Sequence, residues 1–306
     1  REPPAVGCSR DTADATGNPT QGTVLSTCLE RRLTGIHRAH FDRGLVAPVY
    51  DEAVKKTMAA MKRTFGTRQR QVRPILKDDV LRMLDALLVD RGAPWWNGFF
   101  SDRSKPCPFF VEWPDENLVE WLDEGLLTPE HVLELGCGHG RNAAFLAGMG
   151  CSVDAVDFSA EAIEWAVERA KTASVPVSFQ CCSIFDATFT EGSYDLVYDS
   201  GCFHHLPPHR RKDYVELVRS ALKPGGSYGL VCFRPEGGGG YTDGQVYEHR
   251  SLGGGLGYSE DRLRALWDEE PFSVHVLRQM TKTDGQGPCF GEDFLWALLA
   301  TKEGPV

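Results

Sequence analysis

The spacing of hydrophobic residues along the chain changes near residue 92. Before that point apolar residues recur every three or four positions, which is the spacing of an amphipathic helix. The pattern predicts helices between residues 28 and 88, the last of them beginning near Asp78, whose charge suits a helix N-terminus. The apolar positions on these stripes are Leu29, Leu33, Ile36, Val54, Met58 and Met61.

After residue 92 the apolar residues gather in short runs that are typical of buried strands. These runs are HVLELG, SVDAVDF, VSFQCCS, YDLVYDS, SYGLVCF, SVHVLRQM and FLWALLAT. Helical segments separate the first five, and this alternation predicts a doubly wound α/β fold with a mostly parallel, seven-stranded Rossmann-like sheet. The last two runs lie close together and suit an antiparallel hairpin at the edge of the sheet. A small helical segment precedes this fold.

Charge divides the chain at the same place. Residues 31–91 carry 14 Lys and Arg against 7 Asp and Glu, a balance of +7, whereas residues 92–306 carry -15 within an overall charge of -10. The first 25 residues are rich in Pro, Gly, Thr and Asp and have no periodicity. We therefore expect a disordered leader at 1–25, a basic helical segment at 26–91 and an acidic α/β domain at 92–306.

Hydropathy and cysteine usage favour a cytoplasmic protein. No run reaches the roughly 18 apolar residues of a membrane span, and the first residues have no apolar core of the kind that a secretory signal uses. The ten cysteines include no CxxC pair and are scattered through apolar segments, so we expect reduced thiols and no metal site.

A glycine-rich turn follows the first predicted strand, in the segment HVLELGCGHG. The turn is GCGHG, which differs from the GxGxxG of a dinucleotide-binding fingerprint. Glu134 precedes its first glycine by two residues, and Asp157 ends the next predicted strand. A glycine turn at this place lets a ligand approach backbone and helix N–H groups beyond the carboxyl ends of the strands.

This segment resembles motif I of class I S-adenosylmethionine-dependent methyltransferases. VDAVDFS, YDLVYDSGCFHHL and LKPGG resemble further motifs of that family, so the resemblance covers residues 95–302. It implies S-adenosylmethionine as cofactor, a glycine turn under its amino-acid end, and Asp157 bonded to both ribose hydroxyls. Many relatives place an acid near the adenine, where this chain has QCCSIFD instead. The implied cofactor-binding residues are Glu134, Gly136, Cys137, Gly138, Gly140, Asp157, Phe158, Cys182, Ser183, Ile184 and Asp199.

Candidates for proton transfer follow the fourth predicted strand. Methyl transfer needs a base only if the nucleophile arrives protonated. Asp199, His204 and His205 are the candidate catalytic residues, because a histidine titrating near neutral pH accepts a proton from a thiol, hydroxyl or amine. The alternative is structural, since endings like FHHL recur in this family as turns.

The segments expected to form the acceptor site are the aromatic stretch WWNGFFSDRSKPCPFF and the glycine-rich insertion at 234–258. The aromatic stretch forms a lid or packs against the sheet, and the insertion is expected to be a mobile loop. The acidic domain without an added recognition module resembles small-molecule methyltransferases of the thiopurine and tellurite-resistance type. This resemblance implies a small-molecule acceptor: a thiol, hydroxyl, amine or metalloid.

Residues 28–88 resemble the helical core-binding region of tyrosine recombinases. No Arg…HxxR…Tyr set follows Leu88, so the resemblance implies a remnant without strand-cleaving activity. We expect residues 26–90 to bind nucleic acid weakly and non-specifically at most. The competing hypotheses are a nucleic-acid methyltransferase or DNA-binding fusion, and a helical extension that covers the active site. The sequence leaves the oligomeric state open.

Overall fold

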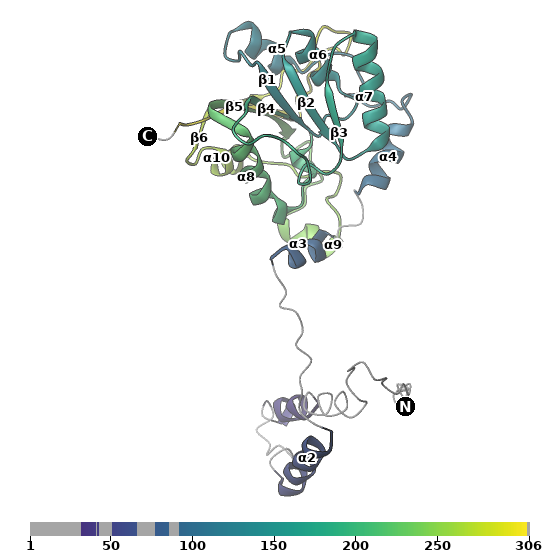
Figure 1. The fold of residues 1–306 in the computed structure, drawn as a ribbon, viewed down its shortest axis with the longest axis vertical. Helices are drawn as coiled ribbons and strands as arrows, with labels where there is room; N and C mark the ends of the chain where they lie inside the picture. The colour runs from purple at the N-terminus through teal and green to yellow at the C-terminus, as the bar shows by residue number, and fades with distance from the viewer. Residues whose placement is uncertain (1–31, 41, 43–50, 66–76, 86–91, 305–306) are drawn as a thin grey trace. The chain divides into compact units, whose positions relative to one another are not determined.

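The computed structural model describes residues 32–40, 42, 51–65, 77–85 and 92–304, in two compact units. The first unit, Arg1–Ile75, contains a helix at 32–40 and helix α2 (Glu52–Phe65) (Figure 1). The second, Leu76–Val306, begins with α3 (Lys77–Asp85). The α3 helix, grouped with the basic helices in the sequence analysis, therefore belongs to the α/β unit. The predicted leader lies outside the described residues.

The second unit is built on one sheet of seven strands, as predicted. Their order is β3-β2-β1-β4-β5-β7-β6, and the first five pair in parallel. The β7 strand lies antiparallel to both β5 and β6, so the predicted hairpin closes one edge of the sheet. The strands are β1 (His131–Leu135), β2 (Ser152–Asp157), β3 (Ser178–Cys181), β4 (Tyr194–Ser200), β5 (Leu222–Phe233), β6 (Phe272–Gln279) and β7 (Leu295–Lys302).

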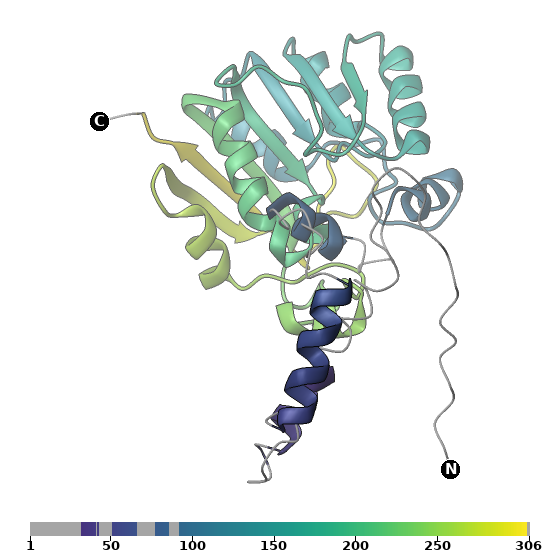
Figure 2. The same ribbon diagram turned by 60° about the horizontal axis from the view of Figure 1, so that its bottom comes forward.

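Helices cover both faces of this sheet (Figures 1 and 2). The alternation of apolar residues along β1 explains the two layers, because Val132 packs into one core cluster and Leu133 into the other. The first cluster contains residues from α5 and α6, and the second contains residues from α8 and α10. The helices of this unit after α3 are α4 (Ala93–Ser101), α5 (Glu116–Asp123), α6 (Arg141–Gly148), α7 (Ala160–Ala173), α8 (Arg211–Ala221), α9 (Asp243–His249) and α10 (Glu260–Trp267).

The glycine-rich insertion after β5 is folded onto the sheet and contains α9. Its backbone closes on itself where the Gly239 amide donates to the Gly255 carbonyl at 2.9 Å. The Leu256 amide donates to the His204 carbonyl at 2.7 Å, and Arg211 pairs with Asp243 at the start of α9. The sequence predicts a mobile loop here, whereas the structure ties the insertion to the turn after β4 and to α8.

Close backbone approach in this insertion gives a testable stability difference between two glycines. A Cβ atom at Gly239 would lie 2.0 Å from the Gly253 carbonyl oxygen, whereas one at Gly244, inside α9, would meet nothing within 4 Å. We expect Gly239→Ala to lower the free energy of unfolding by at least ~1–3 kcal/mol, the usual cost of overpacking. Gly244→Ala is the matched control, and alanine there favours the helix by about 1 kcal/mol. Equal melting temperatures of the two variants would contradict this packing.

None of the described helices combines the length and the apolar character that a membrane crossing requires.

Candidate functional site

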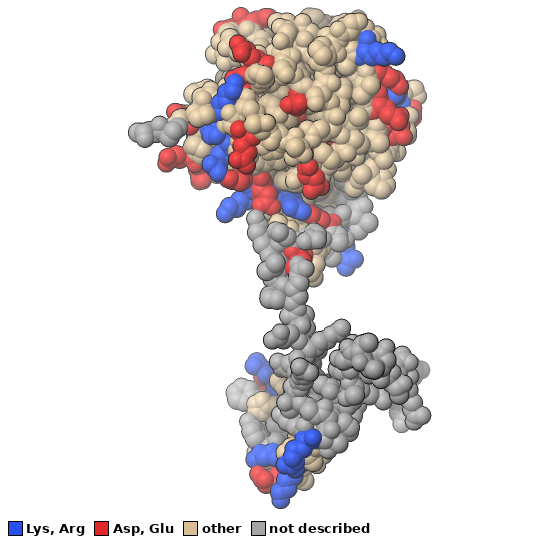
Figure 3. Space-filling model, in the orientation of Figure 1, with Lys and Arg blue, Asp and Glu red and all other residues tan. Residues whose placement is uncertain are grey.

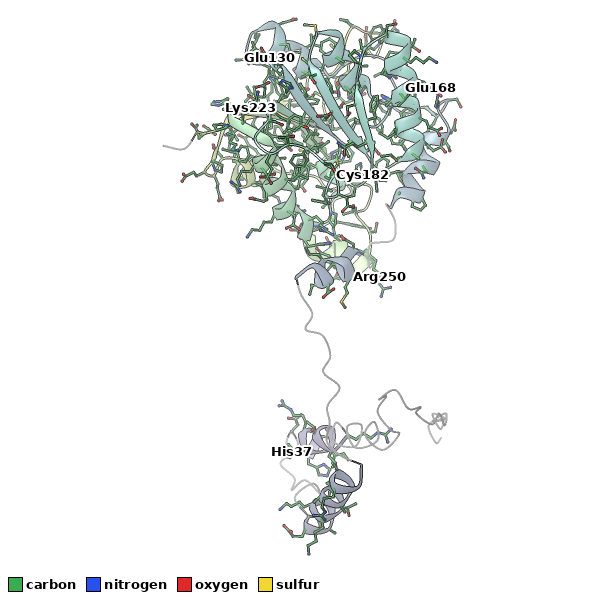
Figure 4. The ribbon with its side chains drawn as sticks, viewed as in Figure 1. His37, Glu130, Glu168, Cys182, Lys223 and Arg250 are labelled. Atoms are coloured by element: carbon green, nitrogen blue, oxygen red, sulfur yellow. The ribbon has the colours of Figure 1, made fainter. Side chains whose placement is uncertain are left out.

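A cavity of about 850 Å³ opens beyond the carboxyl ends of the parallel strands. Figure 4 marks the two ends of the sheet, with Glu130 ahead of β1 and Cys182 after β3 on opposite sides. The cavity lies at the Cys182 end, and its wall includes residues that follow β1, β2, β3 and β4. This is the position at which open α/β sheets bind ligands.

The glycine turn at 136–140 forms the floor of this cavity. Gly136 and Gly140 have φ values of +68° and +74°, which residues with a side chain rarely adopt. A Cβ at Gly136 would lie 2.5 Å from Cβ of Cys202, and one at Gly140 would lie 2.7 Å from Cβ of Ala166. These glycines therefore let the turn pack against the β4 exit and against α7. Gly136, Cys137 and Gly138 line the cavity, whereas Gly140 lies behind its wall.

Asp157 ends β2 with its carboxylate at the cavity wall and is 7% exposed. One oxygen accepts from the Gly138 amide and the other from the Ser159 amide, both at 2.9 Å. Burial raises the pKa of this carboxyl group, while the bonds from Ser159, Gly138 and Phe158 act in the opposite direction. Each oxygen keeps a second lone pair for a ligand hydroxyl. The next residue, Phe158, also lines the cavity.

Glu134 is the most perturbed acid of the wall. It is 2% exposed, and its Oε2 atom has no hydrogen-bond partner within the structure that the described residues form. Burial is the main reason that its pKa rises to about 8, with Arg141 lowering it and Asp115 raising it. A buried acceptor without a donor is costly, so this oxygen suits a ligand that brings a positive charge or N–H groups.

A buried ionic network holds the wall beside Glu134. Arg141, at the start of α6, donates to Asp115 at 2.5 Å and to Ser200 at 3.2 Å, and its guanidinium lies over the Phe290 ring. Tyr198 on β4 donates to the same Asp115 at 2.7 Å. Because α5, α6 and β4 meet in this network, the region around Glu134 is pre-organised.

The connection after β3 supplies another part of the wall. Ser183 and Ile184, for which the sequence predicts a position beside the adenine, are part of the cavity wall. Cys182 lies outside the wall and is partly buried, with its amide donating to the Asp157 carbonyl at 3.1 Å. The strand-to-turn geometry therefore directs the residues after Cys182 towards the cavity.

Asp199 lies beneath the site and does not line the cavity. Its carboxylate is fully buried and accepts from the Cys202 amide at 2.8 Å, the Phe203 amide at 3.0 Å and the Tyr214 hydroxyl at 2.5 Å. Burial raises its pKa to about 7 against these bonds. This arrangement anchors the 3₁₀ turn at Phe203–His205 and keeps the Asp199 carboxylate away from the cavity.

Both histidines of that turn line the cavity. The Phe233 amide donates to Nδ1 of His204 at 3.2 Å, and the two rings stack with centroids 3.7 Å apart. In a neutral imidazole only one nitrogen accepts, so this bond places the hydrogen of neutral His204 on Nε2. The His205 ring meets the Trp96 ring edge-on at 4.9 Å.

The aromatic stretch before β1 is divided between the cavity and the packing around it. Trp96, Phe100 and Phe109 line the cavity, whereas their neighbours pack against them or face outwards. The stretch is attached to α7, because Asn97 bonds Ser159 and Arg103 pairs with Glu168. Different residues of this segment therefore contribute to the cavity wall and to the packing around it.

Several wall residues lie outside the predicted set. Asp85 on α3 pairs with Arg210, while aromatic residues come from the end of β5 and from the connection between β6 and β7. The sequence shows that these segments contain aromatic residues, but it does not show that they line the same cavity, because that depends on tertiary structure. These additional residues include Asp85, Arg141, Phe185, Arg210, Phe233, Phe290 and Phe294.

The described residues include no cluster of three or more His, Cys, Asp or Glu side chains suited to a metal ion.

A methyltransferase domain family matches residues 132–226, which include the parts of the cavity wall that follow β1, β2, β3 and β4. The 2-heptyl-1-hydroxyquinolin-4(1H)-one methyltransferase of Mycobacteroides abscessus is 28% identical over 130 residues, which are 41% of this chain and 56% of that enzyme. The chain thus spans little more than half the length of this relative. An uncharacterized methyltransferase of Schizosaccharomyces pombe is 30% identical over 104 residues, which cover 34% of this chain and 72% of that protein.

A solved structure supports the fold. This structure was solved in work on the conversion of a disulfide bond into a thioacetal group during echinomycin biosynthesis. It superposes on this chain with a TM-score of 0.52 at 23% sequence identity. The superposition covers 65% of this chain and 85% of that one.

Proposed function

We propose, from the premise that this chain belongs to the methyltransferase family, that it transfers the methyl group of S-adenosylmethionine to a small, uncharged aromatic acceptor. The observation that carries the proposal is a single cavity with two chemically different parts. Acids and a glycine turn line one part, whereas aromatic rings and two histidines line the other. The first part suits the cofactor and the second suits an acceptor.

The residues of the first part fit S-adenosylmethionine. The partnerless Oε2 of Glu134 suits the cofactor's ammonium group, and the two oxygens of Asp157 have lone pairs for the ribose hydroxyls. Ser183 and Ile184 supply a small, apolar surface for the adenine. When bound, the cofactor supplies a methyl group activated on a sulfonium. The chain then needs only to orient the acceptor and exclude water.

The acceptor part favours a flat, neutral molecule. Trp96, Phe109 and Phe233 offer ring faces and edges, which bind aromatic molecules through area burial and offset stacking. Among the described residues, the wall contains three aspartates and two arginines besides Glu134, whose raised pKa leaves it largely protonated at neutral pH. An anionic acceptor would face this acidic excess, which disfavours it.

We assign proton acceptance to His205. In neutral His204 the bond from Phe233 engages the accepting nitrogen, so that ring presents a donor. His205 lies against Trp96, next to where an aromatic acceptor would stack. An aromatic hydroxyl suits a histidine base, because its pKa lies within a few units of that of imidazole. The Mycobacteroides relative is named for a hydroxyquinolinone, a flat ring system whose hydroxyl is carried by the ring nitrogen, and this supports an acceptor with a ring-borne hydroxyl.

A labelled methyl-transfer screen tests the function. The full-length chain is incubated with S-adenosylmethionine carrying a radioactive methyl group and with separate sets of aromatic hydroxyls, thiols, amines, arsenite and tellurite. We expect label in one or more aromatic hydroxyls. Label confined to a thiol or metalloid would replace the acceptor class and favour the thiopurine and tellurite-resistance type. No label in any set, with intact cofactor binding, would refute transfer to a small molecule.

DNA and transfer RNA belong in the same screen, because the basic helices favour a weak interaction with polyanions. Residues 31–91 carry +7, but residues 92–306 carry -15. Figure 3 shows acidic side chains gathered over α7, whose sequence contains Glu161, Glu164 and Glu168. We propose at most weak, non-specific binding through residues 26–90, with dissociation constants of roughly 10⁻⁴–10⁻⁶ M at physiological salt. Label in nucleic acid, or nanomolar binding in a gel-shift titration, would reverse this proposal.

A further inference from the structure

An ion pair at the wall of the cavity joins α3 to the segment before α8. Asp85 ends α3, and Arg210 precedes α8 by one residue; both side chains line the cavity. One guanidinium nitrogen bonds Asp85 Oδ2, and Nε donates to Oδ1 at 3.2 Å. The guanidinium also lies 5.0 Å from the centre of the Phe185 ring, another wall residue. The positive charge therefore lies at the cavity, compensated by an acid from a different segment.

We propose that Asp85 determines acceptor charge: it neutralises Arg210 and so excludes acceptors that carry a carboxylate. This inference rests on the proposed function, since Asp85 and Arg210 line the cavity that the proposed acceptor would enter. When the negative charge of Asp85 is removed, the positive charge of Arg210 becomes available to an anionic group on the acceptor. Arginine binds carboxylates through two parallel N–H bonds, which makes it a strong site once it is uncompensated.

A second set of bonds holds Asp85 in this position. His209 Nε2 lies 2.9 Å from Asp85 Oδ1, and the other ring nitrogen lies 2.9 Å from the hydroxyl of Tyr247 on α9. The His209 amide donates to that same hydroxyl, so the Tyr247 O–H is left to donate to Nδ1, and Nε2 carries the hydrogen that Asp85 accepts. Although burial raises the pKa of Asp85, the bonds from Arg210 and His209 outweigh it and lower the pKa. The acid is therefore ionised at neutral pH.

Another acid near Arg210 provides the matched control. Asp213 lies 3.6 Å from the guanidinium, one turn along the chain, and it is not part of the cavity wall. Both acids compensate Arg210, but of the two only Asp85 belongs to the cavity wall. A general effect of lowering negative charge would appear in Asp213→Asn as well, whereas charge selection would appear in Asp85→Asn alone.

The experiment compares two probes of equal shape, 4-hydroxybenzoate and 4-hydroxybenzamide. Their binding to the full-length chain is measured by tryptophan fluorescence in the presence of S-adenosylhomocysteine, with methyl transfer measured in parallel. We expect Asp85→Asn to raise the affinity for the benzoate relative to the benzamide by about tenfold, which corresponds to ~1.4 kcal/mol. Asp213→Asn changes this ratio less than twofold. The double variant Asp85→Asn with Arg210→Gln returns the ratio to that of the unmodified chain.

The ratio of affinities separates this inference from the proposed function. A ratio that is unchanged in Asp85→Asn, or that changes equally in Asp213→Asn, overturns the inference, even where the unmodified chain methylates aromatic hydroxyls. Failure of both probes to bind any variant also counts against it. If the ratio changes as expected but no aromatic acceptor is methylated, the inference about charge holds and the proposed transfer reaction fails. If the substitution only loosened α3, both probes would bind more weakly by the same factor. A change in the ratio of their affinities therefore cannot arise from loosening alone.

Discussion

We expect Asp157→Ala to lower the affinity for S-adenosylmethionine by at least tenfold. The carboxylate has lone pairs for two ribose hydroxyls, and charge-assisted hydrogen bonds contribute about 1.5–3 kcal/mol each when they replace bonds to water. The substitution also removes the acceptor of the Gly138 and Ser159 amides, so the glycine turn loses one of its attachments to β2. Isothermal titration calorimetry measures the loss directly.

Two further variants separate ligand binding from loss of structure. Glu164→Ala removes an exposed acid of α7 that does not line the cavity, and it should leave the affinity within twofold. Asp157→Asn keeps one accepting oxygen but turns the other into a donor that opposes a backbone amide, so we expect an intermediate affinity. An Asp157→Ala protein that is folded and binds the cofactor with unaltered affinity would remove Asp157 from the cofactor site.

Most of the sheet follows from local pattern. Each of the seven apolar runs became a strand with bounds within a few residues of the prediction, because buried strands must be continuous and apolar. The alternation of strand and helix then leaves little freedom in topology. The sequence predicts that β6 and β7 form a hairpin, but it does not predict that β7 lies between β5 and β6. A short connection indicates that two strands pair, but it does not indicate which of them pairs with the rest of the sheet.

The candidate site was predictable where it depends on the ends of strands. Glu134, Asp157 and His204 belong to three strand ends that meet at one edge, so sequence order alone brought them together. Asp199 belongs to the same edge, but its side chain alternates to the buried side and meets Tyr214. Successive side chains of a strand point in opposite directions, so Asp199 is buried beneath the site whereas the next residue, Ser200, lines the cavity.

The remainder of the site depends on contacts between distant segments. Asp85 and Arg210 are 125 residues apart, and α3 lies within a pattern that looks continuous with the preceding basic helices. Charge and periodicity grouped this helix with residues 26–91. The α3 helix packs against the segment before α8 because Asp85 and Arg210 pair in the folded chain, and the local sequence pattern does not predict this contact.

The affinity for S-adenosylmethionine should rise with pH between 6.0 and 7.5 because of Glu134. The pKa of this carboxyl is raised by burial to about 8 in the cofactor-free protein. A bound ammonium group favours the ionised form, so binding lowers that pKa and releases a proton. Below pH 8 each unit of pH therefore increases affinity by up to about tenfold. The window stops at 7.5 because an α-amino group itself loses its proton near pH 8.

Glu134→Gln tests whether this carboxylate is the cause. The amide has no ionisation, so the variant should bind more weakly at pH 7.5 and lose most of the pH dependence. Calorimetry in two buffers of different ionisation enthalpy should report release of close to one proton by the unmodified protein at pH 7 and markedly less by the variant. The pH dependence of stability has the opposite sign. A folded pKa above the ordinary glutamate value of 4.5 contributes stability at low pH that is lost as pH rises through about 8. The cofactor-free protein should therefore become less stable between pH 6 and 8.5 as affinity increases, and equal slopes of affinity against pH in both proteins would show that Glu134 does not face the ammonium group.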